Sequence, residues 1–308
     1  MTKLLVIGEH DVRRLLPMDE CIEAMEAALT ALAHDEVFNP LRFVIRPPSA
    51  PLMGFMPAYR AGDTPLFSLK EIVIAPENSA RGLDPHQGGV LVHDGVTGEL
   101  LALLNASPVT EIRTAAVSAV ATRALARPES RVVTIVGGGI QARSHAEAMS
   151  IVFPEAELRT WSRAGGGSLA DALAGADVVC TCTSAREPIV SREWLDPGTH
   201  VNAVGSSIPS TRELDTATMA AASLFVDRRE STLNESGDYL LAAADGAFGD
   251  EHIRAEVGEV LVGTHPGRAS DDELTVFKSL GIAVEDLASA ELVVERAREH
   301  GVGIEVEF

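Results

Sequence analysis

The chain has 308 residues, which suits about two domains, and 46% of them are apolar, so large cores can form. The formal net charge is -20, and this acidity argues against a nucleic-acid partner, because a phosphate backbone needs concentrated positive charge. No apolar run approaches the roughly 18 residues of a membrane span, and Leu4–Gly8 is too short for the core of a signal peptide. We therefore expect a cytoplasmic protein without a membrane partner.

The cysteines and histidines do not predict a structural bridge or a metal centre. Cys21, Cys180 and Cys182 form an odd, sparse set, which does not make a disulfide framework. Cys180 and Cys182 lie in an apolar run that is typical of a buried strand. The nine histidines lack the spacing of a metal-binding helix, so no metal site is predicted.

The first hundred residues predict a short strand, one helix and then a series of strands. Leu4–Gly8 is the short strand, and a helix begins at Pro17 and ends near Glu36, with one apolar stripe along it. Clusters of Pro, Gly and Asp separate the later strands. These strands are predicted at Leu41–Arg46, Leu52–Tyr59, Leu66–Ile74, Gly89–His93 and Leu100–Leu104.

The rest of the chain alternates strands with helices. A helix is predicted from Ser107 to about Ala126, and from Arg131 the alternation is that of a doubly wound parallel sheet. Its strands are predicted at Val132–Val136, Leu158–Trp161, Asp177–Thr181, His200–Val204 and Ser223–Val226. A final helix spans about Val284–His300, and the strand Val302–Phe308 can return to the first domain, which makes that domain discontinuous. The predicted fold class is α/β: a Rossmann-type doubly wound sheet inserted in a discontinuous α+β domain.

A glycine-rich turn joins the first strand of this alternating region to its first helix. Gly137 allows the tight turn, Gly139 lets the backbone approach a phosphate, and Ala142 stands where a third glycine is usual. The helix then offers free N–H groups and a partial positive charge. This order predicts a bound dinucleotide, although a plain turn would have the same short glycine run.

The end of the next strand indicates which dinucleotide. NAD-binding versions place an acidic residue there to hold the ribose hydroxyls, whereas this chain has Ser162 and Arg163. Arg163 would bind a 2′-phosphate by charge-assisted hydrogen bonds, which favours NADP(H), with NAD(H) as the alternative. An exposed loop arginine without a ligand is the simpler interpretation of Arg163.

Three cations are candidates for binding a small carboxylate. Lysine occurs only at Lys3, Lys70 and Lys278, and Lys70 lies in an apolar strand where burial is costly without a partner or a function. Arg113 lies among small residues, and Arg42 precedes a strand. Each is more often a surface residue, and spacing alone does not bring them together.

Along nearly its whole length the chain resembles the ornithine cyclodeaminase/mu-crystallin family, and is closest to its mu-crystallin-like ketimine reductases. The matching motifs are Pro40-Leu-Arg42, Met56-Pro57, Lys70, Thr110-x-x-Arg113-Thr-Ala-Ala116, Gly137-x-Gly-x-Gln-Ala142, Asn202-Ala-Val-Gly205 and the block Thr275–Asp286. Each motif is ordinary alone, but together they are specific for the family.

The resemblance implies a homodimer, an NAD(P)-binding Rossmann domain at residues 116–289, and a substrate-binding and dimerisation domain at 1–115 plus 290–308. The active site would lie in the cleft, with Arg42, Lys70 and Arg113 at the substrate carboxylate and the reacting nitrogen. The residues implied to line the cofactor are Gly137, Gly139, Ile140, Gln141, Ser162, Arg163, Thr183, Val204, Gly205 and Ser279.

Two departures distinguish this chain from the cyclodeaminases of the family. Ser207 takes the position of their aspartate, and Thr211 that of the lysine four residues on. Serine has no accessible pKa for general-base work at neutral pH without activation. The segment from Ala164 to Asp177 is also shorter than in the family, which is expected to trim the helix and strand after the ribose site.

The prediction is therefore NADPH-dependent reduction of small cyclic ketimine carboxylates, of the pyrroline- or piperideine-2-carboxylate type, with Lys70, Ser207 or water as the proton donor. Ornithine cyclodeamination or alanine dehydrogenation with NAD is the enzymatic alternative. A non-catalytic, NADP-bound protein that binds a small amino acid or cyclic imine is the alternative of a different class.

Overall fold

The computed structural model describes residues 3–308, apart from the side chain of Ser79. The chain divides into two compact units: unit 1 is Met1–Arg113 with Ile282–Phe308, and unit 2 is Thr114–Gly281. The second boundary implied by the resemblance, 289/290, lies inside a helix that belongs wholly to unit 1. Among the described residues, no helix is both long enough and apolar enough to cross a membrane.

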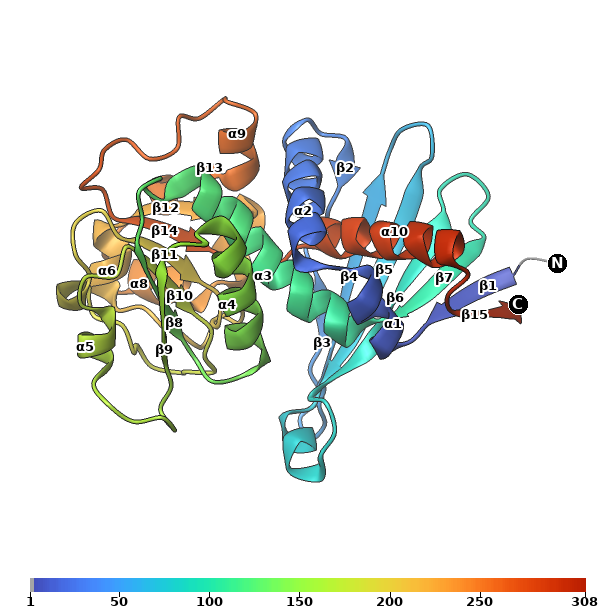
Figure 1. The fold of residues 1–308 in the computed structure, drawn as a ribbon, viewed down its shortest axis with the longest axis horizontal. Helices are drawn as coiled ribbons and strands as arrows, with labels where there is room; N and C mark the ends of the chain where they lie inside the picture. The colour runs from blue at the N-terminus through green and yellow to red at the C-terminus, as the bar shows by residue number, and fades with distance from the viewer. Residues whose placement is uncertain (1–2) are drawn as a thin grey trace. The chain divides into compact units, whose positions relative to one another are not determined.

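Unit 1 is built on a mixed sheet whose strand order is β15-β1-β7-β6-β5-β4-β2, with β3 paired to β4 (Figure 1). Its strands are β1 (Lys3–Ile7), β2 (Val37–Phe38), β3 (Phe43–Ile45), β4 (Leu52–Arg60), β5 (Leu66–Ile74), β6 (His86–Asp94), β7 (Leu100–Asn105) and β15 (Ile304–Glu307). β15 pairs antiparallel with β1, which confirms that the last strand returns to the first part of the chain.

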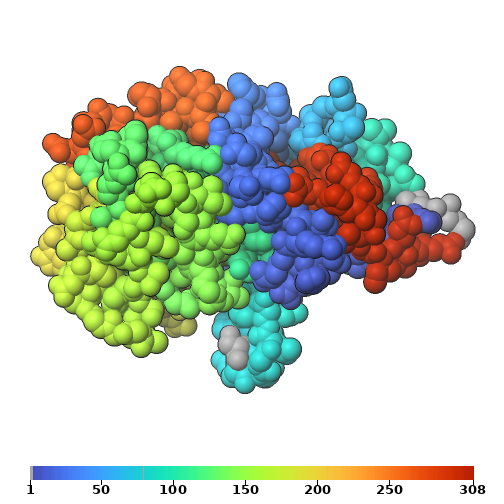
Figure 2. Space-filling view, viewed as in Figure 1, coloured from blue at the N-terminus to red at the C-terminus, as the bar shows by residue number. Residues whose placement is uncertain are grey.

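Helices cover one face of this sheet. Helix α10 (Ala283–His300) contacts β4, β5 and β6, and helices α1 (Glu9–Leu15) and α2 (Met18–Ala33) pack against α10. Figure 2 shows α10 in red beside the blue N-terminal helices. Ala283 and Leu287 of α10 form a small core with Met56 and Ala58 of β4. This contact holds the first turn of α10 over the middle of the sheet.

Unit 2 is a parallel sheet with the order β13-β12-β14-β11-β10-β8-β9. Helices α3 and α4 lie on one face, and α5, α6 and α8 on the other (Figure 1). This confirms the predicted Rossmann-type sheet. Its strands are β8 (Val132–Val136), β9 (Glu157–Trp161), β10 (Val178–Thr181), β11 (His200–Ala203), β12 (Ser223–Val226), β13 (Ile253–Glu256) and β14 (Thr275–Lys278). Its helices are α4 (Ile140–Val152), α5 (Leu169–Leu173), α6 (Thr216–Ala221), α7 (Arg229–Glu235), α8 (Gly237–Ala244) and α9 (Val257–Leu261), while α3 (Ala106–Leu125) begins in unit 1.

Sequence reasoning missed α1, β13 and β14. The two strands have four residues each, and charged residues interrupt their apolar pattern: Arg254 and Glu256 in β13, and Lys278 in β14. Lys278 is buried and forms an ion pair with Asp238, a distant partner that the local sequence pattern does not reveal. The shortened segment after β9 forms the five-residue helix α5, and β10 follows it intact, so the expected trimming does not remove this strand.

Candidate functional site

Lys70 lies in the middle of β5, an inner strand of the unit 1 sheet between β4 and β6. It pairs with Met56 of β4 on one side and with Val90 of β6 on the other. Strand alternation puts it on the face that α10 covers, and only 2% of its surface is exposed. A lysine at such a place requires a charged partner, because a bare buried ammonium is very costly.

The partner is Asp286, in the first turn of α10. Lys70 Nζ donates to Asp286 at 2.8 Å, and it lies 3.5 Å from Thr110 Oγ1 at the start of α3. Arg113, one turn further along α3, donates through Nε to Asp286 at 3.0 Å and through Nη1 to Glu285 at 2.8 Å. The fold thus joins Lys70 and Arg113 through one shared carboxylate, Asp286, and gives Arg113 a second one, Glu285, in the same first turn of α10.

The electrostatics of this cluster tune the lysine. Burial lowers the pKa of Lys70 to about 8, against the attraction of Asp286, and the charge of Arg113 adds to the lowering. Burial alone would raise the pKa of Asp286, but the charges of Lys70 and Arg113 outweigh it and hold that pKa below its ordinary value. Lys70 is therefore a cation at neutral pH that gives up its proton more readily than a surface lysine.

Arg42 lies on the same row of the sheet. It precedes β3, in which Phe43 pairs with Phe55, and one further step of this register puts Arg42 level with Met56 and thus with Lys70. Its charge also contributes to the lowered pKa of Lys70. The cluster has three cations and two carboxylates, so its net charge is +1, which suits an anionic ligand. The cations are Arg42, Lys70 and Arg113, and the carboxylates are Asp286 and Glu285.

Sequence reasoning missed these carboxylates and a nearby histidine. Asp286 and Glu285 read as ordinary acids in the first turn of a helix, and the demand of a buried lysine for a partner was the available signal. His86 follows a loop in which Asp84 accepts hydrogen bonds from the His86 N–H and from Ser107. Burial lowers the pKa of His86 against the attraction of Asp84, and the Lys70 charge adds to the lowering.

In unit 2 the glycine turn has the geometry expected for a dinucleotide. Gly137 has a φ of 149°, and a Cβ there would lie 2.6 Å from the Cys182 carbonyl oxygen, so both conformation and space require glycine. Gly139 caps α4, and a Cβ there would meet no heavy atom of the described chain within 4 Å. The backbone at Gly139 is therefore open to an approaching phosphate, at a helix N-terminus that favours anions.

Three other residues of the predicted cofactor set lie in the first turn of α4 or at the carboxyl end of a parallel strand. Ile140 is 38% exposed, which is unusual for a large apolar side chain, and Gln141 follows it in the first turn of α4. Ser279, directly after β14, is buried, and its hydroxyl has no hydrogen-bond partner among the described residues. Ile140 lies at the open glycine turn, whereas Ser279 lies at the end of β14, which β11 and β10 separate from β8 in the sheet order. The orphaned hydroxyl of Ser279 at this edge of the sheet fits a bound polar group.

Ser162 and Arg163 follow β9, next to the glycine turn in the sheet order. Ser162 Oγ accepts from the Gly165 N–H at 3.1 Å, and a Cβ at Gly138 would lie 3.1 Å from the Ser162 Cβ, so the serine packs directly against the turn. Arg163 is exposed. The two residues stand where a ribose or its 2′-phosphate is bound in this fold.

Thr183, Val204 and Gly205 follow β10 and β11. The Thr183 hydroxyl is already used, since it donates to Glu213 at 2.6 Å, while the Gly205 N–H donates to Glu213 at 2.7 Å. Val204 continues the ladder to Thr181, and Ser207 lies half-buried in the loop that follows. Arg212 forms an ion pair with Asp245 at 3.2 Å. Glu213 matches the resemblance to the mu-crystallin-like members of the family, but sequence reasoning assigned it no role.

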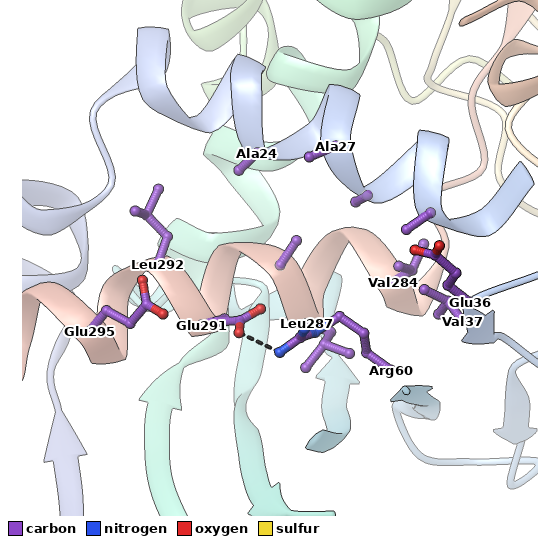
Figure 3. Close-up of a pocket in the computed structure, with 13 residues that line it drawn as sticks. Ala24, Ala27, Glu36, Val37, Arg60, Val284, Leu287, Glu291, Leu292 and Glu295 are labelled. Atoms are coloured by element: carbon purple, nitrogen blue, oxygen red, sulfur yellow. Dashed lines mark hydrogen bonds and ion pairs between the residues drawn. The ribbon is translucent and has the colours of Figure 1, made fainter. Parts of the chain in front are cut away.

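A cavity of about 360 Å³ lies between α2 and α10 of unit 1 (Figure 3). Alanines line one side, and the Arg60–Glu291 ion pair lies at its edge. None of the predicted site residues lines it. Among the described residues, no group of three or more potential ligand side chains could hold a metal ion.

The protein is thus a two-unit α/β protein. One unit is a parallel sheet with a dinucleotide-type glycine turn, and the other holds a buried cluster of cations and carboxylates. Residues 3–167 and 165–301 match the family model of the ornithine cyclodeaminase/mu-crystallin family. The chain belongs to that family, and the family predicted from its motifs is confirmed.

Three relatives illustrate the range of the family. Ketimine reductase mu-crystallin of Mus musculus is 42% identical, with 89% of this chain and 91% of that protein covered. The Thermococcus litoralis Delta(1)-pyrroline-2-carboxylate reductase, solved with NADH and L-proline, is 34% identical with a TM-score of 0.92, covering 98% and 100% of the chains. An archaeal alanine dehydrogenase dimer with bound NAD is 31% identical with a TM-score of 0.94, and both chains are covered completely.

Proposed function

We propose that this protein is an NADPH-dependent oxidoreductase that reduces small cyclic ketimine carboxylates, of the pyrroline- or piperideine-2-carboxylate type, to cyclic amino acids. The observation that carries the proposal is the cluster of Arg42, Lys70 and Arg113 with Asp286 and Glu285, which has one net positive charge and a lysine pKa of about 8. Relatives that are 42% and 34% identical are reductases of ketimines and of pyrroline-2-carboxylate.

Each residue of the cluster has a part in this proposal. Arg42 and Arg113 bind the substrate carboxylate, since a guanidinium matches its two oxygens. Asp286 and Glu285 hold the Arg113 guanidinium in place, and Asp286 orients the Lys70 ammonium toward the ring nitrogen. Lys70 supplies the proton that the nitrogen gains, while the C=N carbon gains a hydride. Fixing these groups in advance lowers the barrier by avoiding reorganisation.

The residues of unit 2 fit a bound nicotinamide dinucleotide, which would supply the hydride. Gly137 and Gly139 would hold the pyrophosphate at the N-terminus of α4. Ser162 and Arg163 would bind the 2′-phosphate, which favours NADPH, and NADH is the alternative. The Thermococcus litoralis relative was solved with NADH, so the choice between the two rests on Arg163.

The experiment follows the absorbance of NADPH and of NADH with piperideine-2-carboxylate, with pyrroline-2-carboxylate and with pyruvate plus ammonia. We expect oxidation with both cyclic imines, and a higher kcat/KM for NADPH than for NADH. Ornithine with NAD is the control for cyclodeamination. If neither cofactor is oxidised by a cyclic imine, the proposed function is wrong; a preference for NADH would overturn the role of Arg163 alone.

Two other functions remain as outcomes of the same assay. Alanine dehydrogenation is favoured by the similarity to the archaeal enzyme, and rapid turnover of pyruvate plus ammonia would support it. Ornithine cyclodeamination is disfavoured because Ser207 stands at the aspartate position. Binding of NADPH without turnover of any substrate would favour a non-catalytic, small-molecule binding protein. The cytoplasmic location expected from the sequence stays a prediction.

We further propose a homodimer. The sheet face opposite α10 carries Phe67, which is 48% exposed and packs on Tyr59 at 4.6 Å, with Leu69 and Leu91 beside it. Such an incompletely covered apolar face is typical of an obligate interface. Sedimentation equilibrium should give twice the chain mass, and Phe67→Glu should shift the protein toward monomers. A wild-type monomer at micromolar concentration would contradict the proposal.

A further inference from the structure

Glu213 is a buried carboxylate that joins the ends of two neighbouring strands in unit 2. Its Oε1 accepts from the Thr183 N–H at 2.8 Å and from the Thr183 hydroxyl at 2.6 Å. Its Oε2 accepts from the Gly205 N–H and from the Thr181 hydroxyl, both at 2.7 Å. Thr181 ends β10, Thr183 lies in the loop after it, and Gly205 follows β11. One side chain therefore fixes the loops at both carboxyl ends.

The carboxylate is held in place from behind. Asp238 Oδ1 accepts from the backbone N–H groups of Glu213 and Leu214, at 2.8 and 3.0 Å. Asp238 also forms an ion pair with Lys278 at 3.1 Å, and Lys278 Nζ donates to the Ala203 carbonyl at the end of β11. Glu213, Asp238 and Lys278 are all fully buried. The position of Glu213 is thus set by a network with little freedom to relax.

The loops that Glu213 fixes lie at a particular place in the sheet. The order β11-β10-β8-β9 puts the glycine turn, after β8, between Ser162, after β9, and the two loops after β10 and β11. A dinucleotide in this fold lies across the carboxyl ends of the strands, with its pyrophosphate at the glycine turn. With the adenosine half at β9, the other half must extend over the loops after β10 and β11.

We infer that Glu213 is a positioning residue for the nicotinamide half of the cofactor, acting through Thr183 and Gly205. The inference rests on the proposed function, since it requires a bound dinucleotide. It also explains why residue 205 is glycine: a Cβ there would lie 2.1 Å from the Thr183 carbonyl oxygen and 2.5 Å from Glu213 Oε1. No larger residue fits between the two loops while the carboxylate joins them.

Replacement of Glu213 by glutamine gives a sharp test, because the two side chains have nearly the same shape. A hydroxyl can reverse its hydrogen bond, but the backbone N–H groups of Thr183 and Gly205 cannot. Whichever way the amide is turned, its NH₂ group faces one of these two N–H donors, which is left unsatisfied. We expect Glu213→Gln to weaken NADPH binding by roughly 10- to 100-fold.

The selective readout compares the whole cofactor with a fragment that lacks the nicotinamide half. By titration calorimetry, Glu213→Gln should bind 2′,5′-ADP as wild type does while binding NADPH more weakly. Hydrogen exchange without cofactor should show faster exchange at Thr183 or Gly205. The control Glu193→Gln, at an exposed position of the same unit, should change neither property.

Equal weakening of fragment and cofactor, or no change in either, would overturn the inference. If Glu213→Gln does not fold, as judged by circular dichroism, Thr183→Val removes one donor to the same carboxylate and should show the same selectivity in weaker form. A wild-type protein that binds neither NADPH nor NADH would overturn the proposed function itself. A different result, in which wild type binds NADPH and Glu213→Gln binds it equally well, would contradict only the role of Glu213.

Discussion

Replacement of Lys70 by methionine is expected to lower kcat/KM for cyclic imine reduction by about 10²- to 10⁴-fold, the range for loss of a positioned proton donor. Methionine fills a similar volume, so the strand should persist. Asp286 keeps Arg113 but loses the ammonium, so the free energy of unfolding should fall as well and is measured alongside turnover. Lys70 is 2% exposed and bound to Asp286, so we do not expect another side chain to take over its position beside Asp286 in the variant. NADPH affinity should not change, because the lysine lies in unit 1.

The pH profile supplies a second test of the same residue. A donor with a pKa of about 8 is protonated below that pH, so wild-type kcat/KM should fall as the pH rises through about 8. This descending limb should be absent from the residual activity of Lys70→Met. Lys3→Met, the same change at an exposed lysine, is the control and should match wild type. A variant at Lys70 with an unchanged rate would remove this residue from the mechanism.

Replacement of Asp286 by asparagine should have the second large effect, because it should lower both the stability of the protein and its turnover. The substitution leaves Lys70 and Arg113 as buried cations without their shared carboxylate, and breaking a buried ion pair in this way costs about 3–5 kcal/mol of stability. Turnover should fall as well, because neither the ammonium nor the guanidinium is held in position. Chemical denaturation measures the stability, and the imine assay measures turnover.

The direction of the shift in the pH profile distinguishes a change in the pKa of Lys70 from a loss of turnover through unfolding of Asp286→Asn. Asp286 raises the pKa of Lys70, so its removal should lower that pKa further and move the descending limb to lower pH. Glu295→Gln, an exposed acid on the same helix, is the control and should leave the limb near pH 8. A folded Asp286→Asn variant with the wild-type profile would show that Asp286 does not tune Lys70.

The glycine turn was the part of the site most open to prediction from the sequence. Its strand, turn and helix are consecutive, and the conformation that requires glycine at Gly137 is a property of a few neighbouring residues. Lys70, Arg42 and Arg113 were candidates as cations, and the family motifs implied a shared role at the substrate; all three lie in unit 1. Both strands that were missed from the parallel sheet are short and interrupted by charge.

The partners of the buried charges were beyond prediction. Lys70 and Asp286 are separated by 216 positions in the chain, and nothing local marks Asp286 as more than an acid favoured at a helix N-terminus. Glu213 likewise reads as one charged residue among many, until the sheet order brings the ends of β10 and β11 to its two oxygens. Local backbone preferences and hydrophobic periodicity depend on neighbouring residues, so most helices and strands, the glycine turn and the family can be predicted from the sequence. Compensation of buried charge depends on which distant segments fold together, so the tertiary structure alone decides how Lys70, Asp286 and Glu213 are used.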